Sequence, residues 1–203
     1  MSGDGGMAFA PAMAEEGVKR NGTAAIAMRV WFAGLAVLLV PALAAWIIRG
    51  VGYAAQCEPN AASCFGAPYD AIMGAALKGT LDLAWLISTN VLLTLGIAIA
   101  AALAAIVALR PVGAALTMLI APLASLLLPT LLVSLTAYDG CAVNVDGLGD
   151  CKVWGQSMGM SFHTAASAPQ LIYTYTPIIV AGALVAGLLG WIVLWGAKQM
   201  QKS

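Results

Sequence analysis

The chain has 203 residues, of which 62% are hydrophobic and 9% are charged. Soluble domains carry about 25% charged residues, so this composition excludes an ordinary soluble domain and indicates a protein that uses lipid as its solvent. Nine basic and nine acidic residues balance to a net charge of zero, and a chain without basic clusters is not expected to bind nucleic acid.

The N-terminal part combines a polar stretch with a first apolar run. Residues 1–24 show no apolar period, which predicts a flexible tail. The first membrane span is expected over residues 25–48, with its apolar centre between Arg29 and Arg49. An alternative interpretation is a cleaved secretory signal within residues 1–44, because small residues follow the run. The apolar run continues beyond these small residues, which favours a retained span.

Three further apolar runs have the length that a membrane crossing requires. They lie at residues 81–109, 112–138 and 173–196. Only Arg110 and Pro111 separate the second span from the third, and a proline there ends one helix and begins the next. These two spans are therefore expected to form a tight hairpin. The predicted fold is an all-α integral membrane bundle of four helices within residues 25–197, followed by a tail at 198–203.

The basic residues predict the orientation of this bundle, because Lys and Arg concentrate in cytoplasmic loops. Of the nine basic residues, six fall on the side of the two termini: Lys19, Arg20, Arg29, Arg110, Lys198 and Lys202. The remaining three fall on the opposite side: Arg49, Lys78 and Lys152. Both termini are therefore expected in the cytoplasm of a bacterium, with the protein in its inner membrane.

All four cysteines lie in the two loops that this orientation places in the periplasm. Disulfides persist in such oxidising compartments. Four cysteines permit three pairings. The pairs Cys57–Cys64 and Cys141–Cys151 are favoured because each closes a short loop, and pairing between the loops stays open. The predicted bundle thus carries two disulfide-stapled periplasmic loops.

Small residues recur at every fourth position along the second and third predicted spans. Transmembrane helices associate through close packing of such residues, so the two ladders are expected to face each other in the hairpin. The alternative is that an alanine-rich chain produces these spacings by chance. The first ladder is Gly96, Ala100, Ala104 and Ala108, and the second is Gly113, Thr117, Ala121 and Ser125.

Two polar residues near or within the second predicted span are candidates for a site. Asp82 is an acid near the span interior, and such residues are functional candidates. Lys78 lies one turn earlier, so an interfacial ion pair between the two is the favoured interpretation. Asn90 is the most polar residue at membrane depth, and it is expected to make an interhelical hydrogen bond.

Beyond the third span, the segment 153–168 mixes aromatic, Met, Gly and Ser residues. It is expected to lie on the outer membrane surface as an interfacial or re-entrant element. Met158, Met160 and His163 combine thioethers with an imidazole, a ligand set that suits Cu(I). Three soft ligands are too few to predict a metal site, so neither a metal nor a cofactor is predicted. Contact with a quinone, a lipid or a pigment is compatible with this surface.

The cysteine layout resembles that of one known family. Four spans, cytoplasmic termini and a cysteine pair in each periplasmic loop are similar to the DsbB family of quinone-dependent thiol oxidases. That family carries a Cys-x-x-Cys in its first loop, whereas six residues separate Cys57 from Cys64 here. The resemblance is one of layout, and no catalytic residue is transferred from it.

The sequence contains no phosphate loop, zinc-protease signature or nucleophile elbow. We therefore expect a small non-catalytic accessory or assembly subunit, bound to other integral membrane subunits of a larger complex, such as an energy-transducing one. A thiol oxidoreductase is the alternative hypothesis. A transporter or channel component is the third, and the lack of charge pairs in the spans disfavours it.

Overall fold

The computed structural model describes residues 10–57, 64–138 and 152–200, and nearly all of them are helical. The elements are α1 (Ala10–Ala54), α2 (Tyr69–Thr89), α3 (Val91–Tyr138), β1 (Lys152–Val153), β2 (Gln156–Ser157) and α4 (Gly159–Met200). Five helical segments of the described chain are long and apolar enough to cross a membrane: Gly22–Ala54, Tyr69–Thr89, Val91–Leu109, Pro111–Leu135 and Gly159–Gly196. The predicted all-α membrane class is therefore confirmed.

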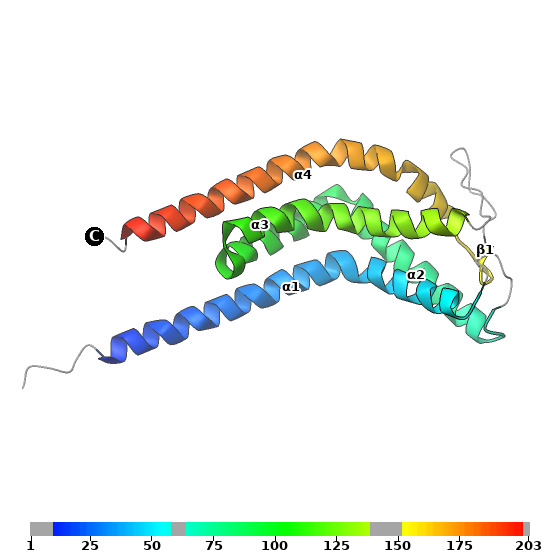
Figure 1. The fold of residues 1–203 in the computed structure, drawn as a ribbon, viewed down its shortest axis with the longest axis horizontal. Helices are drawn as coiled ribbons and strands as arrows, with labels where there is room; N and C mark the ends of the chain where they lie inside the picture. The colour runs from blue at the N-terminus through cyan, green and yellow to red at the C-terminus, as the bar shows by residue number, and fades with distance from the viewer. Residues whose placement is uncertain (1–9, 58–63, 139–151, 201–203) are drawn as a thin grey trace, which may run out of the picture.

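The helix α3 supplies two of these segments because the chain turns back at Arg110 and Pro111 (Figure 1). We call Val91–Leu109 the first arm of α3 and Pro111–Leu135 the second arm. The turn between the arms marks one end of the bundle, which we call the turn end. The opposite end, where β1 and β2 lie, is the disulfide end.

The five segments run back and forth between the two ends of the bundle. Figure 1 shows α1 running from the turn end to the disulfide end, and α2 followed by the first arm returning to the turn end. The second arm runs to the disulfide end and α4 returns from it, so α1 begins and α4 ends at the same end of the bundle. Close approaches fix this arrangement: Gly190 of α4 lies against Pro111, and Gly34 of α1 lies against Ala101.

The structure divides the predicted span 81–109 between two helices, because α2 begins at Tyr69 and the helix breaks after Thr89. Asn90 has an extended backbone, with ψ of 93°. Its Oδ1 accepts the N–H of Leu93 at 3.1 Å, which is the capping bond that makes asparagine a favoured N-cap residue. The polar run at this depth therefore ends one helix and begins another.

Three other predicted boundaries were wrong. Residues 10–24, expected to belong to a flexible tail, are part of α1, and α4 likewise continues into the predicted tail as far as Met200. Alanine, glutamate, methionine, lysine and arginine favour a helix without any apolar period. The span predicted at 173–196 begins at Gly159, so residues 159–168 are helical turns of α4 and not a surface element of their own.

The strands β1 and β2 form a two-residue hairpin whose turn is Trp154 and Gly155. Both residues have positive φ, 46° and 77°, as the tightest antiparallel turns require. The turn inserts the indole of Trp154 into the disulfide end, where only 1% of the residue is exposed. The ring of Phe65 packs edge-on against it, with centroids 5.5 Å apart. Trp154 is therefore the centre of the apolar cluster at this end.

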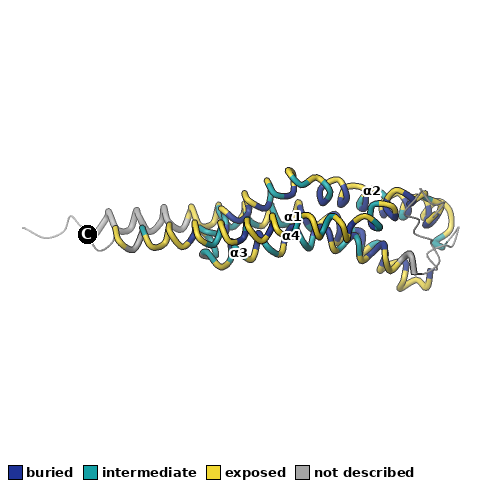
Figure 2. The backbone as a smooth tube through the Cα atoms, turned by 90° about the horizontal axis from the view of Figure 1, so that it is seen from above, coloured by how far each residue is buried: buried dark blue, intermediate teal, exposed yellow. Residues whose placement is uncertain are grey.

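The outer surface of the bundle carries many large apolar side chains. Figure 2 shows exposed positions recurring along the described parts of each helix. They include Ile47 on α1, Leu92 on α3 and Leu184 on α4, which are 68%, 86% and 70% exposed. Contiguous apolar surface on this scale marks contact with lipid or with other membrane helices. The protein is a membrane protein, and lipid is its surrounding medium.

Close approach of α1 to Trp154 gives a direct test of the disulfide end. A Cβ atom on Gly52 would overlap the indole ring of Trp154, whereas a Cβ on Gly50 would meet nothing within 4 Å. We expect Gly52→Ala to destabilise the protein by about 1–3 kcal/mol, the usual cost of overpacking. Gly50→Ala should leave stability unchanged or slightly raised, because alanine favours a helix. Thermal unfolding in detergent measures both, and equal melting temperatures would contradict this packing.

Candidate functional site

The disulfide end holds the first pair of predicted site residues. Cys57 and Cys64 form a disulfide, as predicted, and the described residues include no free cysteine. Cys57 is 7% exposed, and its N–H donates to the carbonyl of Gly52 at 3.0 Å. The predicted Cys141–Cys151 pair lies outside the described residues.

Asp70, in the first turn of α2, holds the chain that follows this disulfide. Its Oδ1 accepts the backbone N–H groups of Cys64 and Phe65, both at 2.8 Å. A carboxylate is favourable at a helix N-terminus, where backbone N–H groups carry partial positive charge. Asp70 is 9% exposed, so these bonds are shielded from solvent. The disulfide is thereby built into a rigid cap on the bundle.

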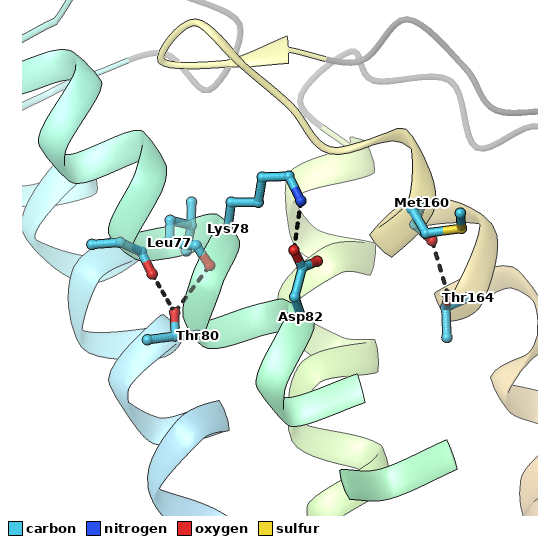
Figure 3. A network of polar contacts seen from close by, with 7 residues as sticks. Leu77, Lys78, Thr80, Asp82, Met160 and Thr164 are labelled. Carbon is cyan, nitrogen blue, oxygen red and sulfur yellow. Dashed lines mark hydrogen bonds and ion pairs between the residues drawn. The ribbon is translucent and has the colours of Figure 1, made fainter. Parts of the chain in front are cut away.

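Asp82, predicted as a candidate polar site, pairs with Lys78 one turn earlier on α2 (Figure 3). The two side chains are 45% and 39% exposed. Exposed ion pairs at this spacing contribute about 0.3–0.5 kcal/mol. Figure 3 also shows Thr80 donating to the carbonyls of Ala76 and Leu77 within the same helix. These contacts are local to α2, as the interfacial interpretation predicted.

The three residues proposed as soft ligands differ in exposure. Met158 belongs to the core, with 2% of its surface exposed, whereas Met160 is 61% exposed. His163 is exposed as well. Among the described residues, no three His, Cys, Asp or Glu side chains gather as metal ligands would.

The two predicted ladders differ in how far they are buried. Thr117, Ala121 and Ser125 of the second arm are buried and Gly113 is half-buried, and the indole N–H of Trp31 on α1 donates to Thr117 Oγ1 at 2.9 Å. This ladder packs inside the bundle.

The first-arm ladder was assigned to the wrong face. Gly96 and Ala100 are exposed, while Ala104 and Ala108 are half-buried. The fully buried small residues of this arm are Ala98, Ala101, Ala102 and Ala105. Small residues surround the arm, so their spacing alone did not reveal which side α1 and the second arm would cover.

The buried face of the first arm predicts that a bulky substitution destabilises the protein at Ala105 and is tolerated at Ala100. Ala105 is 0% exposed in the cluster that includes Ala121 and Leu38, so Ala105→Leu should force the helices apart. We expect a loss of about 1–3 kcal/mol. Ala100→Leu places the same side chain on the exposed face and should cost less than about 0.5 kcal/mol. Thermal melts of the two variants in one detergent provide the comparison. A greater loss of stability for Ala100→Leu would show that the ladder predicted from the sequence is the packing face.

The break at Asn90 creates a polar centre inside the bundle. Thr94 Oγ1 donates to the carbonyl of Ile87 across the break, and Thr89 Oγ1 donates to the carbonyl of Trp85 at 2.6 Å. The hydroxyl of Tyr175 on α4 approaches the carbonyl of Thr89 at 3.4 Å. Side-chain hydroxyls of this kind satisfy the backbone groups that a broken membrane helix leaves free.

This network corrects the expectation for Asn90. Its Oδ1 caps its own helix, and the link between helices at this depth comes from Tyr175. The short polar run was visible in the sequence, but the N-cap signal within it was missed.

Two adjoining cavities open beside the break, between the first arm and α4. The first is lined by Ser88, Thr94 and Tyr175 together with aliphatic side chains. The second, of about 240 Å³, runs along the first arm and α4 toward the turn end. Leu95 and Ile178 line both cavities. We call the combined feature the arm–α4 groove, and it is the candidate binding site of the molecule.

No family model, curated protein or solved structure matches this chain. The arrangement of its own residues provides two candidate binding surfaces: the exposed small-residue face of the first arm and the arm–α4 groove.

Proposed function

We propose that the protein is a non-catalytic accessory or assembly subunit of a larger complex of the bacterial inner membrane, such as an energy-transducing one. The observation that carries this proposal is the outward face of the first arm. Gly96 and Ala100 are exposed there, and a Cβ on Gly96 would meet nothing within 4 Å. Small residues on a membrane helix allow the backbone of another helix to approach closely.

The outward face is additional to the packing that the bundle needs for itself. The first arm already contacts its own neighbours through Ala98, Ala102 and Ala105. Lipid alone places no demand for small residues on an exposed face, because large aliphatic side chains are equally soluble in it. Large side chains are exposed on the same arm, including Leu103 and Val107, so Gly96 and Ala100 leave a short gap in this surface. A partner helix would approach the backbone of the first arm most closely at this gap.

The proposed topology has four membrane crossings, both termini in the cytoplasm and the disulfide end in the periplasm. The second arm has 25 residues, enough for about 37 Å of helix and hence for a hydrocarbon core of about 30 Å. The two ends of the described chain lie together at the turn end (Figure 1), as an even number of crossings requires. The disulfide at the opposite end supports an oxidising compartment there.

Burial of Cys57, together with the hydrogen bond that holds the backbone of Cys64, favours a structural role over thiol oxidation. A cysteine that exchanges disulfides must be accessible to its partner thiol, whereas Cys57 is 7% exposed and bonded through its backbone to α1. The neighbouring residue Cys64 is anchored by Asp70. These contacts make the pair a staple for the periplasmic cap.

The proposal that a partner subunit docks on the first arm is tested by purifying the tagged full-length protein from native membranes in a mild detergent. We expect a membrane protein to co-purify in a fixed ratio and to be lost, by about ten-fold or more, from Ala100→Leu. The matched control is Ala181→Leu, an exposed position on α4, which should retain the partner. Both variants should melt as the unchanged protein does. Full retention of the partner by Ala100→Leu would refute docking at this face, and a protein that purifies alone would refute the subunit proposal.

The role of the disulfide is tested by changing Cys57 and Cys64 together to Ser. We expect the stability of the disulfide end to fall by about 2–4 kcal/mol, because the staple restricts the unfolded loop. Thiol oxidation of periplasmic proteins should continue at its normal rate in cells that carry this variant. A mixed disulfide trapped between Cys57 or Cys64 and a periplasmic thioredoxin-like protein would instead establish a redox role.

A further inference from the structure

The arm–α4 groove has an aliphatic part that is open to the bilayer. Its lining includes Leu103, Val185 and Leu189, which are 55%, 56% and 48% exposed. The groove therefore faces the surrounding medium along its side and is not an enclosed core cavity. A ligand from the lipid phase can enter it without any movement of the helices.

The other end of the groove holds a buried hydroxyl without a partner among the described residues. Ser88 is 2% exposed, and its Oγ makes no hydrogen bond there. Nearby hydroxyls all bond to backbone carbonyls, as those of Thr94 and Ser125 do. A buried hydroxyl that lacks such a bond is unfavourable in an apolar site. Ser88 thus marks a position where a polar atom of a ligand would be stabilised.

The lining of the groove selects an aliphatic ligand with a polar atom near Ser88. The aliphatic part of the groove encloses about 240 Å³, less than the roughly 300–1,000 Å³ of sites for drug-sized molecules. The free space beside Ser88 is about 10 Å³, which is room for about one water-sized group. That space accepts a single oxygen atom, while the rest of the ligand lies against the aliphatic lining.

We propose that the arm–α4 groove binds one acyl chain of a membrane phospholipid and that Ser88 Oγ donates a hydrogen bond to its ester carbonyl. The chain lies along the first arm from Leu95 to Ile106, which is about 16 Å of helix rise. The charged pair Lys78–Asp82 precedes Ser88 by about 9–15 Å of helix rise, on the side where the headgroup lies. The bound lipid fills the side of the bundle between the first arm and α4.

The test uses the full-length protein, stripped of lipid in detergent and titrated with palmitoyl-oleoyl phosphatidylglycerol under native mass spectrometry. We expect one lipid to bind per chain. Ala186→Leu, which fills the groove, should weaken binding by about ten-fold or more. Ala181→Leu, exposed on α4 and outside the lining, is the matched control and should bind normally. Melting temperatures establish that both variants are folded.

The hydrogen bond is tested separately with a diether analogue of the same lipid, which has no ester carbonyls. The unchanged protein should bind the diether about five-fold more weakly than the ester. Ser88→Ala should bind the ester with the same loss and show no further loss with the diether, because the two changes remove one interaction. Ser167→Ala, an exposed position on α4, should keep the preference for the ester.

Three outcomes would overturn the proposal. One is equal binding of the lipid by Ala186→Leu and the unchanged protein. Another is equal binding of ester and diether lipids by the unchanged protein. The third is displacement of the lipid by a long-chain ubiquinone at equal concentration, which would show that the groove takes a quinone and not a phospholipid chain. The diether comparison uses the unchanged protein, so it remains decisive even if a variant fails to fold.

Discussion

The backbone of a membrane helix cannot leave its polar groups unpaired in lipid, and this constraint determines what happens at Asn90. The break there removes the regular helical bonds across several residues. Thr89, Asn90 and Thr94 replace them with side-chain bonds to backbone atoms on either side of the break. The chain can therefore change direction inside the bundle at little cost. The orientation of the first arm follows from this change, because its residues no longer continue the faces of α2.

That orientation determines which surfaces are available for binding. With Ala98, Ala102 and Ala105 turned inward, Gly96 and Ala100 must lie on another side of the same helix. The break also leaves Ser88 facing the space beside Tyr175, where a continuous helix would have packed the next turn. The outward face and the polar end of the groove are thus two results of one local feature, although each is tested by different variants.

Much of the architecture was predictable from the sequence, and the failures share a physical reason. Apolar runs identified the membrane class, the Arg110–Pro111 turn separated two helices, and loop spacing identified the Cys57–Cys64 pair, since each depends on local chemistry. The break was missed because a polar run inside an apolar stretch was treated as part of one span. The inward face of the first arm was missed because spacing does not encode which neighbour covers a helix. The insertion of Trp154 between α1 and α2 depends on contacts far apart in sequence, which no local pattern revealed.

The alanine content of the first arm is explained by the number of its neighbours. One side approaches α1 so closely that a Cβ on Gly34 would lie 2.9 Å from the Cβ of Ala101. A second side, through Ala102, lines the arm–α4 groove, and a third carries Gly96 and Ala100 outward. A leucine-rich helix would satisfy lipid equally well, but it would hold each of these neighbours farther from the backbone. Short side chains on several sides of the helix therefore permit close approach to more than one neighbour, whereas Leu103 and Val107 on its exposed side face the surrounding medium.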